Sequence, residues 1–157
     1  DLALTHAGHY AINAMRLEKA YRAWGHELST DETPLEAGLG FTLDWQTDFQ
    51  GKQALLEQKT QGIRKRLLAF TLEDPETTLW GSEPIHRNGK LAGYTTSAAF
   101  SPTLGRAVAL GYVRLPDDGI TNRELLECPF EIVNNGQAYK ALPSITSPYD
   151  PERSKMT

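Results

Sequence analysis

Apolar side chains recur along the first part of the chain with the period of a helix. Between Tyr10 and Trp24 they are spaced by four, three, four and three residues, which places them on one face of an α-helix. Gly25 follows at the position where helices commonly end in a left-handed residue. The pattern therefore predicts a helix over residues 10–24 that packs against a larger domain.

A second helix is expected over residues 49–61. Asp48 is suited to cap its first turn, and Gly62 is suited to end it. Leu55 and Leu56 are expected to form the buried edge of this helix. The segment that precedes it, residues 40–45, has the pattern of a short strand.

From residue 66 onward the pattern becomes that of short strands separated by turns. Asn88-Gly89 and Asn135-Gly136 are dipeptides suited to the type I′ turn of a β-hairpin. The expected strands cover residues 67–72, 84–87, 91–96, 107–114, 130–133 and 138–142. Repeated short strands with such turns predict a small barrel or sandwich, so the chain is assigned to the α+β class with a β-rich second half.

Composition limits the classes of partner. The 157 residues are enough for one domain or two small subdomains. The net charge is −4 and the 16 basic residues are dispersed, so nucleic acid is not an expected partner. No apolar stretch approaches the roughly 20 residues that cross a bilayer. With Cys128 as the single cysteine, a soluble protein of a reducing compartment is expected, with no membrane partner.

Charged side chains at two places are candidates for binding. Glu18 lies on the flank of the apolar stripe, four residues before Arg22, so the spacing alone favours an ion pair between them. Arg64 and Arg66 are two residues apart, so in a strand their side chains lie on the same face. The pattern alone favours a solvated face there over an anion site.

Self-contained catalytic signatures are absent from the sequence. There is no glycine-rich phosphate loop, nucleophile elbow, paired-cysteine motif or carboxylate dyad. His6 and His9 are three residues apart, but no third ligand is nearby, so no metal site is predicted. The sequence therefore assigns neither a catalytic residue nor a metal.

Five segments, in this order, resemble motifs of the aminomethyltransferase family, the family of the glycine cleavage T-protein. The resemblance runs from about Gly8 to Pro148. Within the family, residues 10–12, 19–25 and 147–151 are most similar to dimethylglycine and sarcosine dehydrogenases. The five segments are Arg16-Leu17-Glu18, residues 33–39 (TPLEAGL), residues 48–55 (DFQGKQAL), residues 93–97 with 101–105 (GYTTS and SPTLG), and residues 109–113 (ALGYV).

The resemblance implies a domain organisation and a cofactor. Residues 1–62 are expected to be the C-terminal part of a folate-binding core, residues 63–147 a small antiparallel β-barrel domain, and residues 148–157 an irregular tail. Tetrahydrofolate is the implied cofactor, and FAD is expected only on a flavin half that precedes the folate half in the dehydrogenases. The implied partners are folate and a small N-methylated amino acid, in the bacterial cytoplasm or the mitochondrial matrix.

The resemblance also implies a folate-binding set. It gives Glu18 the task of reading the pterin ring, because a carboxylate can accept two parallel N–H bonds from the ring's amino group and adjacent N–H. Tyr21 and Trp24 are expected to add aromatic contacts, and Arg64 or Arg66 to meet the glutamyl carboxylates of folate. The family's catalytic aspartate lies in an N-terminal part of the folate module that precedes this sequence, so this segment alone is not expected to catalyse transfer.

Three functions remain open from the sequence. The leading hypothesis is a C-terminal fragment of a dimethylglycine or sarcosine dehydrogenase-like enzyme that forms 5,10-methylenetetrahydrofolate. The second is a stand-alone T-protein, which acts on a lipoyl-bound aminomethyl group. The third is a non-catalytic folate-binding or regulatory protein on the same scaffold.

Overall fold

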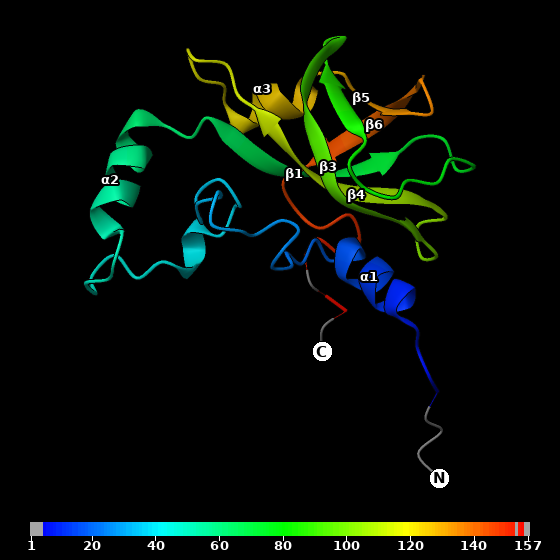
Figure 1. Cartoon of the computed structure of the whole chain (residues 1–157), viewed down its shortest axis with the longest axis horizontal. Coiled ribbons are helices and arrows are strands. Elements are labelled where there is room, and N and C mark those ends of the chain that lie inside the picture. Colours follow the sequence, from blue (N-terminus) through cyan, green and yellow to red (C-terminus); the bar gives the residue numbers. More distant parts are fainter. Residues whose placement is uncertain (1–4, 153, 156–157) are drawn as a thin grey trace.

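A closed six-stranded antiparallel β-barrel dominates the computed structural model of the chain, which describes residues 5–152 and 154–155 (Figure 1). Helix α1 packs against the outside of the barrel, and no helix in the described part of the chain has the length and apolar character that crossing a bilayer requires. The elements are α1 (His9–Glu18), η1 (Gly40–Thr42), α2 (Lys52–Gln61), β1 (Lys65–Leu72), β2 (Pro84–Arg87), β3 (Lys90–Ser101), β4 (Arg106–Arg114), α3 (Asn122–Glu127), β5 (Phe130–Asn134) and β6 (Gln137–Ser144).

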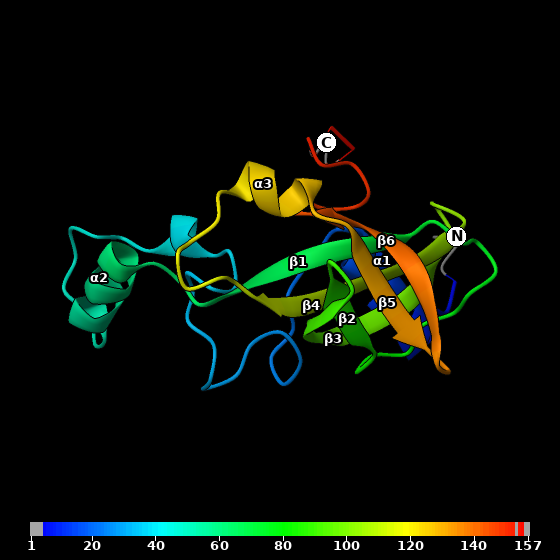
Figure 2. The same cartoon turned by 90° about the horizontal axis from the view of Figure 1, so that it is seen from above.

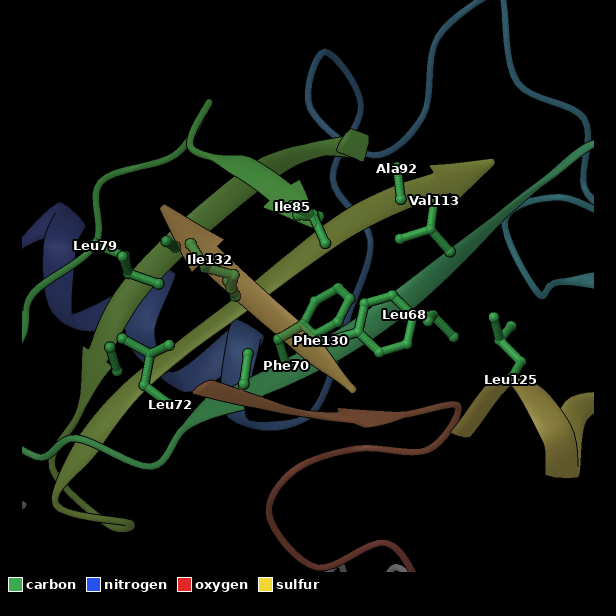
Figure 3. Close-up of a cluster of buried hydrophobic side chains, with 14 residues drawn as sticks. Leu68, Phe70, Leu72, Leu79, Ile85, Ala92, Val113, Leu125, Phe130 and Ile132 are labelled. Carbon is green, nitrogen blue, oxygen red and sulfur yellow. The ribbon is translucent and has the colours of Figure 1, made fainter. Parts of the chain in front are cut away.

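Strand β1 closes the barrel by pairing on both of its edges. The strand order is β1-β4-β3-β2-β5-β6, and β1 pairs with β4 over most of its length and with β6 over Ala69–Leu72. Alternate side chains point inward, where the rings of Phe70 and Phe130 meet at 5.4 Å between centroids (Figure 3). The fold class expected from the sequence, helices followed by a small antiparallel barrel, is confirmed.

Both expected hairpins are present with the expected turns. Asn88 and Gly89 have φ values of 53° and 72°, and Asn135 and Gly136 have values of 50° and 78°. Positive φ at both central residues is the requirement of a type I′ turn, which Asn-Gly meets with little strain. These two dipeptides therefore fix the β2–β3 and β5–β6 connections locally.

Helix α1 ends at Glu18, so the predicted continuation to Trp24 is wrong. Ala20 adopts a left-handed φ of 52° just after the helix. The amides of Ala20 and Tyr21 donate to the carbonyls of Leu17 and Arg16, which is the pairing of a Schellman motif. Glycine is the usual residue at this position. Because alanine stands there instead, the sequence does not indicate that the helix ends.

The α2 region also differs from expectation. Gly62 ends the helix as predicted, but Gly51 precedes its first turn in place of Asp48. None of its side chains is buried, and residues 40–45 contain the short helix η1 in place of a strand. Figures 1 and 2 both show α2 standing away from the barrel, which explains why Leu55 and Leu56 find no core to enter.

The short helix α3 was missed by the sequence reasoning. Thr121 and Glu124 form a capping box, in which each side chain bonds the backbone N–H of the other residue. Leu125 of this helix is buried in the cluster that fills the barrel (Figure 3). The Thr-x-x-Glu signal was present in the sequence and could have located the helix.

Strands β3 and β4 approach so closely that Gly93 cannot carry a side chain. A Cβ added at Gly93 would lie 1.8 Å from the Tyr112 carbonyl oxygen, which is a backbone atom. We expect Gly93→Ala to lower the free energy of unfolding by about 3 kcal/mol, because the strands must separate to admit the methyl group. Urea denaturation measures the change. Gly8→Ala, where nothing lies within 4 Å, is the control, and equal losses in the two variants would contradict the explanation.

The tail after β6 returns to α1 and is held there by an ion pair. Lys19 Nζ lies 2.6 Å from Asp150 Oδ2, and the Tyr149 amide donates to the Glu18 carbonyl at 2.9 Å. The bond from Lys19 holds the pKa of Asp150 at about 2, below the ordinary 3.8. Since the folded-state pKa is depressed, the contribution of this pair is complete above about pH 4 and is lost as the pH falls toward 2.

Acid titration of the tail tests this reading. We expect the NMR signal of the Tyr149 amide to report release of the tail between about pH 4 and pH 2. Asp150→Asn should weaken the docking at neutral pH and remove the transition from this window. An unchanged acid transition in Asp150→Asn would show that another group holds the tail.

Candidate functional site

Helix α1 is fixed to the barrel by its apolar face. Leu17 and Ala20 pack on side chains that point outward from β1 and β4, among them Leu67, Val108 and Leu110. The helix therefore lies across β3 and β4, which carry most of its contacts. The polar residues that α1 carries are held at set positions above these strands.

Glu18 is anchored to the end of β3. The residue is 6 % exposed, and its carboxylate accepts bonds from the Ser101 hydroxyl at 2.5 Å, the Thr103 amide at 3.2 Å and the Thr103 hydroxyl at 3.0 Å. The ion pair with Arg22 that the spacing favoured is wrong, because Arg22 donates instead to the carbonyls of Ala20 and Ala37. Glu18 thus ties the last turn of α1 to the β3–β4 connection.

A second buried carboxylate, Glu27, anchors the other flank of the helix. Glu27 is 0 % exposed, and its carboxylate accepts bonds from Arg16 Nη1 at 2.9 Å, the Ala23 amide at 3.0 Å and the Thr96 hydroxyl at 2.7 Å. Arg16 also donates to the Ser97 hydroxyl at 2.7 Å. The network joins α1, the loop after it and β3.

An irregularity in β3 makes this network possible. The pairing register with β4 shifts between Thr95 and Ser97. A bulge of this kind breaks the strict alternation of a strand. Two consecutive side chains, Thr96 and Ser97, can therefore both reach the helix-side network through Glu27 and Arg16.

Tyr112 of β4 bonds the backbone of the loop that contains Glu27. Its hydroxyl donates to the Glu27 carbonyl at 2.9 Å, and Lys65 Nζ lies 5.1 Å from the centre of its ring. Burial raises the pKa of the Tyr112 phenol well above its ordinary value. The hydroxyl therefore stays protonated and keeps donating across the whole physiological range.

A groove lies beside α1, between the helix, β3 and the segment that contains Trp80. It consists of an apolar pocket of about 320 Å³ and a smaller, more polar pocket of about 100 Å³, and Tyr10, Asn13 and Trp80 line both. Tyr10 and Trp80 are 76 % and 75 % exposed, and their rings meet edge to face at 6.4 Å. The apolar pocket is completed by Ala14, Thr78, Leu79, Ala98, Ala99 and Phe100, and the smaller one by His9, His26, Thr96, Ser97 and Ala98.

The exposed rings of Tyr10 and Trp80 and the amide of Asn13 give this groove a definite chemistry. Exposed aromatic faces offer apolar contact area to a flat ring, while the amide of Asn13 supplies a directional polar contact. We call this surface the α1 groove. It can accept a planar heteroaromatic group with polar atoms on its rim.

The predicted folate-binding residues are not gathered in this groove. Within the described part of the chain, Glu18, Tyr21 and Trp24 line neither of its pockets. Tyr21 and Trp24 follow the end of α1, and Trp24 is 73 % exposed. The sequence reasoning missed Asn13 and the groove itself, and it counted Tyr10 as part of a buried stripe.

The two predicted arginines lie elsewhere, around the start of β1. Arg64 is exposed and lines a cavity of about 520 Å³ that also contains Asp117 and Asp118. Arg66 is half-buried, its Nε is buried without a hydrogen-bond partner among the described residues, and burial lowers its pKa. Burial lowers the pKa of Arg22, and the positive charge of Arg66 lowers it further.

Removing the Glu18 carboxylate tests its anchoring role. We expect Glu18→Ala to lower the free energy of unfolding by about 3 kcal/mol, because the fully buried Ser101 hydroxyl loses its acceptor and the end of α1 loses its bonds to Ser101 and Thr103. Urea unfolding measures the loss. Glu57→Ala on the exposed face of α2 should change stability little. A stability of Glu18→Ala equal to that of this control would rule out the anchor.

Comparison with known proteins agrees with the architecture. The family model described as the glycine cleavage T-protein C-terminal barrel domain matches residues 65–150, and the model of the GCVT N-terminal domain matches residues 1–47. The crystal structure of glycine cleavage system aminomethyltransferase T from Bartonella henselae superposes with a TM-score of 0.73 at 22 % identity. It covers 88 % of this chain and 37 % of that one, and supports the fold.

Two longer relatives match at higher identity. Mitochondrial sarcosine dehydrogenase of Mus musculus is 36 % identical over 156 residues, which is 98 % of this chain and 17 % of the relative. The mitochondrial pyruvate dehydrogenase phosphatase regulatory subunit of Mus musculus is 43 % identical over 140 residues, 85 % of this chain and 16 % of the relative. The chain thus spans about a sixth of the length of each. With the barrel model matching more than half of its residues, the chain belongs to the glycine cleavage T-protein (aminomethyltransferase) family.

Proposed function

We propose that the chain forms part of a tetrahydrofolate-dependent one-carbon transfer module, in a protein that resembles sarcosine and dimethylglycine dehydrogenases and produces 5,10-methylenetetrahydrofolate. The observation that carries this proposal is the α1 groove, which lies on the helix that bears the Arg16-Leu17-Glu18 motif. Similarity to sarcosine dehydrogenase along 98 % of the chain supports the assignment to the dehydrogenase branch of the family. A small N-methylated amino acid is the proposed second substrate, in the bacterial cytoplasm or the mitochondrial matrix.

The groove suits the ring of a folate for physical reasons. A pterin is flat, and aromatic contacts with Tyr10 and Trp80 can stabilise it by about 1 kcal/mol each beyond the area that they bury. The groove rests on a helix that is fixed at both flanks by buried carboxylates. Rigid placement of the ring is what a transfer reaction needs, because the rate depends on holding the reacting atoms within contact distance.

Glu18 remains a ligand candidate with limited capacity. A carboxylate has about four acceptor positions, and Ser101 and Thr103 occupy three of them. We propose that the remaining position on Oε2 accepts an N–H from a part of the ligand that lies outside the α1 groove, because Glu18 lines neither pocket of the groove. Tyr21 and Trp24 stay candidates for aromatic contact at the far side of the helix end.

Arg66 is a better candidate than Arg64 for the glutamyl carboxylates of folate. The cavity that Arg64 lines also holds Asp117 and Asp118, whose charges oppose an anionic ligand. Arg66 lies close to Arg22, and its buried Nε lacks an acceptor among the residues described. A carboxylate would supply that acceptor and offset the repulsion between the two cations. FAD is proposed only for a flavin half outside this chain.

Ligand titration tests the proposal. We expect the 157-residue chain to bind tetrahydrofolate saturably, as measured by NMR of its tryptophan indole signals. Trp80→Ala should weaken the affinity about tenfold, because it removes one wall of the groove. Phe41→Ala, which removes an exposed ring from η1, is the matched control and should leave the affinity unchanged. Absence of saturable binding to the unchanged chain would overturn the proposal.

A regulatory role is the second candidate, and one observation favours it. The phosphatase regulatory subunit is 43 % identical over 140 residues, a higher identity than that of sarcosine dehydrogenase. A longer protein that binds tetrahydrofolate through this module yet never converts sarcosine or dimethylglycine would support regulation. Formation of 5,10-methylenetetrahydrofolate from either amine would support the enzyme, whereas transfer only from a lipoyl-bound aminomethyl group would favour a stand-alone T-protein.

A further inference from the structure

The amide of Asn13 has a fixed orientation in the α1 groove. Asn13 lies in the middle of α1, half-buried, and lines both pockets of the groove. Arg16 Nε donates to Asn13 Oδ1 at 2.8 Å. A guanidinium carries donors only, so the atom that faces it must be the amide oxygen. The Asn13 NH₂ group therefore points away from Arg16, and no acceptor among the described residues bonds it.

Arg16 cannot easily turn away and free the amide. It also donates to the Glu27 carboxylate, the Ser97 hydroxyl and the Tyr21 carbonyl, at 2.9, 2.7 and 3.0 Å. Losing the bond to Glu27 would leave a fully buried carboxylate with fewer partners, and losing the bond to Ser97 would leave that buried hydroxyl without its donor. The orientation of the Asn13 amide is thus set by a network that spans α1 and β3.

Two hydroxyl groups that line the smaller pocket together with Asn13 already have a partner. The Thr96 hydroxyl bonds the Glu27 carboxylate, and the Ser97 hydroxyl accepts from Arg16. Around them the apolar pocket presents Trp80, Phe100 and small aliphatic side chains. Asn13 is therefore a preset donor at the edge of an aromatic wall, and such a site selects a flat ring with an acceptor on its rim.

We propose that Asn13 is a specificity-determining residue, which donates an amide N–H to the ring carbonyl of the pterin. This inference rests on the proposed function. The carbonyl at ring position 4 accepts hydrogen bonds, whereas a 4-amino analogue presents N–H donors at the same place. The Asn13 N–H would then face the N–H of the 4-amino group, so no hydrogen bond would form and both groups would be left unpaired. A site built to bond the carbonyl therefore binds the 4-amino analogue less well.

A matched pair of ligands and variants tests the proposal. Affinities of folic acid and of its 4-amino analogue are measured by NMR titration of the 157-residue chain, of Asn13→Asp and of Asn122→Asp. The unchanged chain should prefer the 4-oxo ligand about tenfold. Asn13→Asp keeps the partner of Arg16 and replaces the donor by an acceptor, so the preference should vanish or invert. Asn122→Asp makes the same chemical change on the distant helix α3 and should keep the preference.

The ratio of the two affinities separates this inference from the function on which it rests. Both ligands carry the same glutamyl charges, so the extra negative charge of Asn13→Asp affects them alike and leaves the ratio to report the hydrogen bond. If both ligands bind and the ratio is equal in all three proteins, the role of Asn13 is wrong and the folate proposal stands. If neither ligand nor tetrahydrofolate binds the unchanged chain, both the folate proposal and the inference about Asn13 are wrong.

Discussion

The ion pair between Arg16 and Glu27 is the interaction on which the arrangement of the candidate site depends. A carboxylate with no exposed surface is costly to bury, and it is tolerated only when its acceptor positions are filled. Arg16, the Ala23 amide and Thr96 fill them. Because these donors come from the helix, the loop after it and β3, satisfying one charge fixes three segments relative to one another.

Strand β3 is the platform for this arrangement. Near its bulge it meets Glu27 and Arg16, and at its end it meets Glu18 through Ser101. Helix α1 is therefore held by a buried carboxylate at each flank of the same strand. N-terminal to these two anchors, the helix presents Asn13 and Tyr10 to the groove. At Gly93 the backbones of β3 and β4 lie so close together that β3 has no room for a side chain.

This rigid platform can serve more than one function. The relatives include a sarcosine dehydrogenase and a phosphatase regulatory subunit, which are 36 % and 43 % identical to this chain. A fold by itself does not specify an activity, because activity resides in the side chains that line a site. For the function that we propose, these side chains are Tyr10, Trp80 and Asn13 of the α1 groove.

Local sequence determined the features that depend on a few neighbouring residues. The two Asn-Gly dipeptides specified their hairpins, the apolar runs specified the strands, and Gly62 specified the end of α2, because backbone preference alone decides these features. The Thr121–Glu124 capping box belongs to the same group, although it was overlooked.

Tertiary structure decided the rest. Ala20 takes a left-handed conformation that its own preference disfavours, and the buried packing of the helix end outweighs that cost. Glu18 bonds Ser101 in place of Arg22, and Trp80 meets Tyr10 across 70 positions of sequence. Contacts between segments so far apart leave no local pattern, so only the closed barrel, which brings the segments together, could define the groove.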